Sequence, residues 1–463
     1  MEQTLSSRHS SSTDDPASAV TRTLARYLVN AQPTDLPAEV RAHTISSFVN
    51  WLGCAVGSTH HPAVEIALAA LNPFSGAPQA TLLGRETRTD VLTAALLNGI
   101  SSHVFDFDDT HLKTVIHPAG PVASAIMALA EYQHIDGEAF IHALTLGIET
   151  ECRIGNAVFP DHYDIGWHIT GTAGVFGAAA AVGKLLGLDE QQMVNALGLA
   201  ASQPVGLREM FGTMTKSFHP GRAAQNGLTA ALLASKGYTS SPQSIEAKRG
   251  WANVVSTRQR YHEITGELGE RHESLLNTFK PFACGIVIHP VIDGCIQLRN
   301  QYSLSGGDID AVQLRVHPLV LELTGKRTPQ TGLDGKFSVY HSAAVALLQG
   351  RAGEHQYSDE AVRDAQTVQL RQRVTAEIEP SLAPDAAQIT LLLKNGQRLE
   401  KTVEHAIGSV AKPMERADLA AKFTDLVTPI LGESQAAALL QAGWDILSCS
   451  DMSDIARLTQ PKA

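Results

Sequence analysis

The chain has 463 residues, a formal net charge of −11 at pH 7 and a hydrophobic content of 44%. Its length allows roughly two or three domains with a large core, and its negative charge argues against nucleic acid or a membrane surface as a partner. The five cysteines form no CxxC pair, which indicates reduced thiols, and no apolar run reaches the length of a membrane span. We therefore expect a cytoplasmic protein.

Helical periodicity dominates the first part of the chain. The Ser-rich residues 1–14 are predicted to be disordered, and Asp15-Pro16 then opens a helix that runs to about Asn30. The 170–187 segment is rich in Gly and Ala, whose small side chains let helices approach closely, so we expect it at the centre of a bundle. Further helices, separated by Gly, Asp or Pro turns, are expected at about 37–55, 61–72, 90–110, 121–134, 137–153, 189–201 and 222–236.

The pattern changes after about residue 275. Three segments alternate as strands do, and Asn395-Gly396 is typical of a hairpin with a type I′ turn. We predict a mainly α protein, with an all-α helical domain built from both ends of the chain (15–274 and 411–463) and a smaller inserted α+β domain (275–410). Within and after the insertion, the expected strands are 312–316, 374–378 and 389–393, and the expected helices are 287–302, 337–349, 415–430 and 434–447.

The most informative stretch is the end of the helix predicted at 90–110. Its apolar stripe continues into His103, Asp106 and Thr110, and His117 follows in a turn before the next helix. Polar groups on a buried face cost free energy unless they are satisfied, so their presence there needs a reason. The sequence predicts a functional site at this junction of two helices.

Other interpretations of this stretch fit less well. Its Asp-x-Asp-x-Thr pattern is found in haloacid dehalogenase-type phosphatases, but there it follows a buried strand; class II terpene cyclases carry Asp-x-Asp-Asp in aromatic-lined cavities, and this chain has 5% aromatics. A metal site made of His103, Asp106 and Asp109 would be oxygen-rich, and no dedicated second cluster accompanies it, so we predict no metal. Asp108 is expected to be the solvated end of the helix.

Polar residues also precede several later helices. Each of them alone is more often structural, but together they repeat one arrangement, a cation near a helix N-terminus, which suits a substrate with several carboxylates. No glycine-rich nucleotide loop, zinc ligand set or nucleophile elbow is present. The residues that share this placement are His168 and Thr170, then Lys216, His219 and Arg222, and finally Lys280 and Cys284.

In combination these motifs resemble the MmgE/PrpD family. The resemblance covers about residues 18 to 450 and rests on H-x-x-D-F-D-D-T at 103–110 followed by H-P, W-H-x-T-G at 167–171, T-K-x-x-H-x-G-R-A-A-x-x-G at 215–227, K-P-F-x-C at 280–284, and the run from Gly335 through Tyr340 to Ala343. It implies an all-α domain with an α+β lid, a homodimer, and no metal or organic cofactor. Members of the family include 2-methylcitrate dehydratases, cis-aconitate decarboxylases and iminodisuccinate epimerases.

The resemblance also implies which residues line the site and what they do. His117 or His168 would transfer the proton, Thr110 and Tyr340 would position or protonate the substrate, and Asp106 would orient a histidine or a lysine. We expect these five to be catalytic. The residues expected to bind substrate carboxylates are Lys216, Lys280, His219, Arg222 and Cys284.

The expected function is a cofactor-independent, dehydratase-like lyase that acts on a small di- or tricarboxylate by removing a proton next to a carboxylate. The loop after Thr110 lacks the W-G-H-P-S-D run of 2-methylcitrate dehydratases, and Cys284 stands where animal cis-aconitate decarboxylases have a His. An epimerase or isomerase, a decarboxylase and a non-enzymatic binding protein therefore stay open as alternatives.

Overall fold

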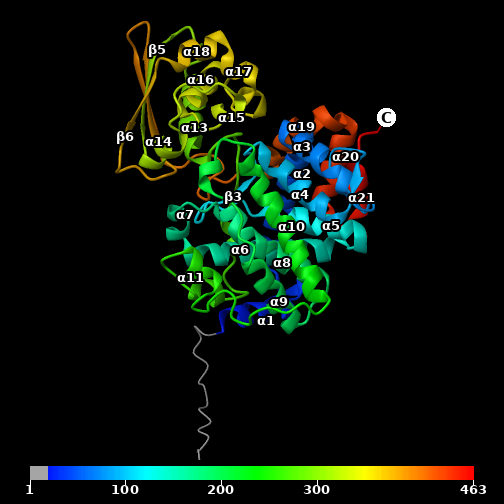
Figure 1. Cartoon of the computed structure of the whole chain (residues 1–463). Coiled ribbons are helices and arrows are strands. Elements are labelled where there is room, and N and C mark those ends of the chain that lie inside the picture. The colour runs from blue at the N-terminus through cyan, green and yellow to red at the C-terminus, as the bar shows by residue number, and fades with distance from the viewer. Residues whose placement is uncertain (1–18, 463) are drawn as a thin grey trace, which may run out of the picture.

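The computed structural model describes residues 19–462, so the predicted disorder of residues 1–14 and the start of the first helix at Asp15 lie outside the described residues. The fold is mainly α, as predicted (Figure 1). Within the described residues, no helix is both long and apolar enough to cross a membrane. The helices before the α+β part are α1 Val20–Asn30, α2 Ala38–Gly57, α3 Pro62–Leu71, α4 Val91–Val104, α5 Ala119–Gln133, α6 Gly137–Val158, α7 Asp161–Ile165, α8 Ile169–Leu185, α9 Glu190–Ala201, α10 Thr215–Ser235, α11 Trp251–Val255 and α12 His262–Thr265.

The centre of the helical part is α8, which packs against α5, α6, α9 and α10. Residues 169–183 are all buried, as the prevalence of Gly and Ala in this helix predicts. The helices α4 and α10 also approach closely, because a Cβ atom on Gly99 would lie 2.5 Å from the Cα of Gly221. This contact holds the end of α4 near the start of α10, where the site lies.

The α+β part contains a four-stranded sheet in the order β6-β5-β7-β8, in which β5 and β6 are parallel and the other pairs are antiparallel. Figure 1 shows this part on one side of the helical part. Its strands are β5 Ile309–Val316, β6 Val374–Ile378, β7 Ala387–Leu393 and β8 Arg398–Val403, and its helices are α13 His289–Gln301, α14 Pro318–Thr324, α15 Gly332–Gly335, α16 Val339–Gln349, α17 Asp359–Arg363 and α18 Ala365–Arg371.

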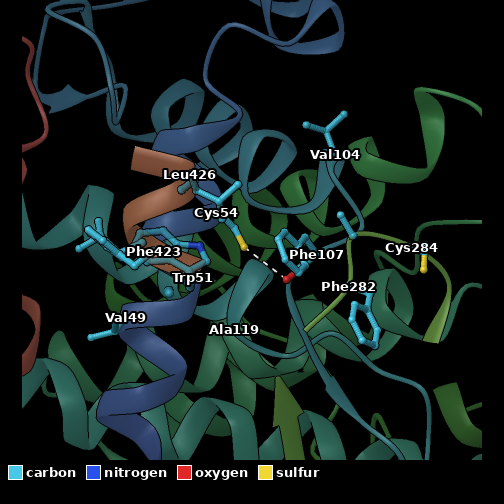
Figure 2. Close-up of a cluster of buried hydrophobic side chains, with 14 of the residues drawn as sticks. Val49, Trp51, Cys54, Val104, Phe107, Ala119, Phe282, Cys284, Phe423 and Leu426 are labelled. Atoms are coloured by element: carbon cyan, nitrogen blue, oxygen red, sulfur yellow. Dashed lines mark hydrogen bonds between the residues drawn. The ribbon is translucent and has the colours of Figure 1, made fainter. Parts of the chain in front are cut away.

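The last helices, α19 Arg416–Leu431, α20 Glu433–Trp444 and α21 Ser453–Leu458, lie beside the N-terminal helices (Figure 1). Two glycines of α2 permit the contact, because a Cβ on Gly53 would lie 2.9 Å from the Phe423 ring and one on Gly57 would lie 2.8 Å from the Leu426 Cβ. Figure 2 shows Phe423 and Leu426 beside Trp51 and Cys54, with Phe107 of the site loop in the same cluster. The domain boundaries at 275 and 410 stay a prediction.

Several local expectations are wrong. The helix that starts after Asp90 ends at Val104 instead of residue 110, and Asp109–His111 forms a short strand, β3, that pairs with β4, Asn277–Phe279. A second small pair, β1 Ala80–Thr81 and β2 Arg88–Thr89, also interrupts the part predicted to be all-α. In the hairpin between β7 and β8 only Gly396 has a positive φ, whereas a type I′ turn requires one at both central residues.

Candidate active site

A cavity opens where the helical part meets the α+β part, with an empty volume of about 540 Å³ that includes its mouth. It combines a few charged and polar groups with apolar and aromatic walls, which is usual for small-molecule sites. The lining residues are Asp106, Thr110, Val115, His117, Tyr163, His168, Phe211, Lys216, Lys280, Gly285, Ile286, Val287, Leu323, Thr324 and Phe337.

Asp106 lies in the loop after α4 and joins two lysines from distant segments. Its Oδ1 atom is 2.6 Å from the Nζ of Lys216, in the first turn of α10, and 2.9 Å from the Nζ of Lys280, just after β4. Burial by itself raises the pKa of Asp106, but the two ammonium groups outweigh it and hold the pKa well below its usual range. The three side chains form one buried ionic cluster on the cavity wall.

His117 is held in one tautomer. Its Nδ1 lies 2.8 Å from the main-chain carbonyl of Asp109, which can only accept, so Nδ1 carries the proton and Nε2 has the lone pair. The Thr110 hydroxyl and Asp108 Oδ1 lie 3.3 and 3.4 Å from the same Nδ1. Burial lowers the pKa of His117 to about 4, against the opposing charge of Asp108, so its imidazole is neutral near pH 7.

Asp108 is buried, which corrects the expectation that it is a solvated helix end. Its Oδ2 lies 2.6 Å from the Nδ1 of His103, in the last turn of α4. Burial by itself raises the pKa of Asp108, but His103 and His117 outweigh it and keep the pKa well below its usual range. Asp108 therefore places a negative charge behind His117.

The second histidine on the wall, His168, precedes α8 and shares a hydrogen bond with His219, whose Nδ1 lies 2.9 Å from the Nδ1 of His168. Burial and the nearby Lys216 hold the pKa of His168 well below its usual range. Burial also lowers the pKa of His219 to about 4. His219 is thus a partner of His168 and does not line the cavity.

Thr170 was expected to precede α8, but it lies inside the helix, and His168 occupies the cap position. Its hydroxyl accepts a hydrogen bond from the backbone N–H of His117 at 3.2 Å instead. Similarly, Lys216 and His219 lie within α10, which begins at Thr215 and continues through Pro220. The expectation of a helix start at residue 222 is wrong.

Besides His219, three more residues expected at the site do not line this cavity. Arg222 is exposed and donates to Gln225 on the surface of α10. Cys284 is fully buried, and burial raises the pKa of its thiol to about 12. Tyr340 is buried on α16, with the Arg327 guanidinium 4.8 Å from its ring centroid.

The apolar walls were missed in the sequence. They come from Val115, from Phe211 before α10, and from three segments of the α+β part, namely 285–287, 323–324 and Phe337. These are single side chains in loops and at helix ends, which carry no periodic signal. They bring the α+β part to the same cavity as the polar residues of the helical part.

His103, Asp108 and His117 are close enough to hold a metal ion, since one potential ligand atom from each lies within 4.8 Å of the others. The Nδ1 atoms of both histidines are already hydrogen-bonded, however. The Nδ1 of His103 bonds to Asp108, and the Nδ1 of His117 donates to the Asp109 carbonyl. A cation bound through the two Nδ1 atoms would have to displace both protons, whereas His103 Nε2 and Asp108 Oδ1 have no hydrogen-bond partner within the described residues. The expectation that the site holds no metal stays a prediction.

Comparisons with known proteins agree on one family. The model for the MmgE/PrpD N-terminal domain matches residues 22–264, and that for the MmgE/PrpD C-terminal domain matches residues 282–446. The chain is 25% identical to a cis-aconitate decarboxylase of Aspergillus terreus, over 96% of both chains. It is 26% identical to the cis-aconitate decarboxylase of Mus musculus, over 83% of this chain and 82% of that one. It is also 25% identical to a 2-methylcitrate dehydratase of Salmonella typhimurium, over 85% of this chain and 86% of that one.

Proposed function

Because the chain belongs to the MmgE/PrpD family, as its motifs predicted, we propose that it is a lyase that removes a proton next to a carboxylate of a small di- or tricarboxylate, with dehydration as the leading reaction. One observation carries this proposal: a neutral histidine of fixed tautomer, His117, lines the same cavity as Lys216 and Lys280. A base beside cations is the arrangement that carbanion chemistry next to a carboxylate needs.

We assign proton removal to Nε2 of His117. The imidazolium that forms is stabilised by the negative charge of Asp108, whose Oδ1 lies 3.4 Å from the Nδ1 of His117. The Asp109 carbonyl keeps the ring oriented. The electron pair of the broken C–H bond forms the C=C bond, and the hydroxyl group leaves from the adjacent carbon. The proton of the His117 imidazolium then passes to that hydroxyl, which departs as water and restores the neutral base.

Lys216 and Lys280 are assigned to the substrate carboxylates. Negative charge that develops on a carboxylate is stabilised most by cations in a site from which water is excluded. Lys280 is 1% exposed and the Lys216 side chain 10%, and the Nζ of Lys216 lies 5.3 and 5.6 Å from the ring centroids of Phe211 and Phe337. Asp106 keeps the two like charges together when no substrate is bound.

A decarboxylase is the second candidate. It is favoured by the relatives that match over nearly the whole chain and carry the name cis-aconitate decarboxylase. The two reactions share the substrate class and differ in the group that leaves. An epimerase or isomerase of a dicarboxylate is the third candidate, and it would need two proton-transfer groups on opposite faces of one carbon; His117 and His168 are the two imidazoles on the wall.

The deciding experiment is proton NMR in D₂O with a panel of citrate, 2-methylcitrate, malate, cis-aconitate and aspartate. A new alkene signal with loss of a C–H signal is expected for a dehydratase. Release of carbon dioxide from cis-aconitate would establish the decarboxylase instead, and deuterium exchange without net elimination the epimerase. If no acid of the panel reacts while calorimetry still detects binding, the protein is a binder and the lyase proposal is wrong.

The remaining expectations are proposals as well. We propose a cytoplasmic homodimer that needs no cofactor and whose α+β part closes over the cavity as a lid. Light scattering on the purified chain tests the dimer, and activity after dialysis against a chelator tests the cofactor. Ligand-dependent protection of the α+β part from limited proteolysis tests the lid; identical digestion patterns with and without substrate would contradict it.

A further inference from the structure

The segment Phe105-Asp106-Phe107 is surrounded by buried ammonium groups. After α4 ends at Val104, each of the next three backbone carbonyls accepts a hydrogen bond from a different lysine. Lys336 reaches the carbonyl of Phe105 at 2.5 Å, Lys280 that of Asp106 at 3.0 Å, and Lys422 that of Phe107 at 2.5 Å. Three cations from three distant parts of the chain therefore meet one tripeptide.

Lys336 and Lys422 also bind the segment that carries Lys280. The ammonium of Lys422 donates to the carbonyl of Lys280 at 2.9 Å, and that of Lys336 donates to the carbonyl of Ala283 at 3.0 Å. Lys422 thus links Phe107 to Lys280, and Lys336 links Phe105 to Ala283. The two links flank the contact between Asp106 and Lys280. Further acceptors hold both ammonium groups in place: Asn50 Oδ1 for Lys422, at 2.7 Å, and the Glu354 carboxylate for Lys336.

The backbone conformation of Asp106 indicates why these hydrogen bonds matter. Asp106 has a φ of 51°, in the left-handed region that a non-glycine residue adopts only when its surroundings impose it. The carbonyls after a helix C-terminus also lack intrahelical partners, and their partial negative charge favours cations there. The two lysines satisfy these carbonyls on both sides of the strained residue.

We propose that Lys336 and Lys422 are positioning residues that hold the Asp106 carboxylate, and through it Lys216 and Lys280, in the geometry needed for substrate binding and catalysis. Neither lysine lines the cavity, and they are 3% and 7% exposed, so they do not touch the substrate. This inference rests on the proposed function only for its effect on turnover. The placement of Asp106 can be tested independently.

Variants K336M and K422M keep most of the apolar stem of the side chain, are one atom shorter, and remove the donor. A matched control is K184M, because Lys184 donates to the carbonyls of Val29 and Ala31, at 2.8 and 2.7 Å, outside the site. All three variants lose two carbonyl hydrogen bonds, so all are expected to have a lower melting temperature. If Lys336 and Lys422 had only a structural role, this loss of stability would be the only effect of their replacement.

The diagnostic measurement is the split between kcat and KM, for the acid of the panel that the wild type converts. K336M and K422M are expected to raise KM and to lower kcat/KM by about 100-fold, the cost of a small misplacement of reacting groups. K184M is expected to keep the wild-type KM. Loss of folded protein alone would lower the apparent kcat and leave KM unchanged, and that result in K336M and K422M would overturn the proposal.

Crystal structures of the three variants separate this inference from the proposed function. In K336M and K422M, Asp106 is expected to leave the left-handed region and to lose its contact with Lys216; in K184M both features should persist. If Asp106 is unmoved in K336M and K422M, the inference is wrong, whatever the activity. If the wild type converts no acid of the panel, the proposed function fails and these structures alone decide. Should a methionine variant not fold, K336A and K422A, which also remove the donor and leave space for water, take its place with the same two outcomes.

Discussion

Lys280 holds Asp106 twice, because its ammonium lies 2.9 Å from the Oδ1 of the carboxylate and 3.0 Å from the backbone carbonyl of the same residue. The two residues are 174 positions apart and almost fully buried. Removal of one partner from a buried ion pair leaves an uncompensated charge in a medium of low dielectric constant. The stability of the protein should therefore depend on this pair far more than on any surface ion pair.

D106N tests that dependence. The substitution keeps the shape of the side chain and leaves Lys216 and Lys280 without their counter-ion, so we expect the free energy of unfolding to fall by about 3–5 kcal/mol. Urea denaturation at pH 7 measures it. D385N is the control, because Asp385 forms an exposed pair with His405 and should change stability little. Equal losses in the two variants would contradict a special role for the buried cluster.

Replacement of His117 by Gln should abolish most of the turnover. The amide cannot accept a proton, so kcat is expected to fall by a factor of about 10²–10⁴ while calorimetry still detects substrate binding. His142 offers a control, since it is also a buried histidine with a pKa lowered by burial to about 4, and it does not line the cavity. H142Q should keep the wild-type kcat. Near-normal turnover in H117Q would remove His117 from the mechanism.

Stability should decrease as the pH falls from about 6.5 to 4. Burial keeps many histidines neutral in the folded protein well below the ordinary value of 6.5, whereas in the unfolded chain they bind protons in this range. The unfolded state then binds more protons, so acidification favours unfolding. The histidines whose pKa falls to about 4, or to about 3 for the last, are His61, His117, His142, His162, His219, His341 and His289.

Carboxyl groups with a raised pKa oppose this trend, among them Asp109, Glu151 and Glu354, whose pKa burial also raises. Burial and the charge of Asp108 raise the pKa of Asp109 to about 7, and burial raises that of Glu151 well above its usual range. The folded protein keeps these groups protonated at a pH where the unfolded chain has lost the protons, so they favour folding as the pH falls. Because the histidines outnumber them, the urea midpoint is expected to be lower at pH 5 than at pH 7. A midpoint that rises on acidification would show that the carboxyl groups dominate.

R222A should leave both activity and stability nearly unchanged. Arg222 is exposed, and its guanidinium bonds to Gln225 on the same helix. Surface substitutions of this kind usually change stability by less than about 0.5 kcal/mol. The measurement is the steady-state KM of R222A compared with that of K216M, because K216M removes a cation from the cavity wall. If R222A loses as much substrate affinity as K216M, Arg222 does bind the substrate and this prediction is wrong.

The sequence alone was sufficient for the secondary structure of most of the chain. Periodicity predicted the major helices, and alternation predicted β5, β6 and β7. These features are local. A helix or strand buries one face, and its apolar residues therefore recur at a fixed spacing along a short stretch of sequence. The same stretch of polar residues after α4 also pointed to the site, because buried polar groups need partners.

Only the tertiary structure decided where α4 ends and what its polar residues contact. The stripe would continue to Thr110, but Asp109–His111 pairs with β4, and the paired residues Thr110 and Thr278 are 168 positions apart in the chain. Likewise, nothing near Lys422 in the sequence distinguishes it from a solvated lysine, the motif that contains Lys336 does not say which groups this lysine contacts, and nothing near Arg222 marks it as exposed. Such outcomes depend on which distant carbonyls and carboxylates each side chain meets, and that is decided when the helices and the α+β part pack together.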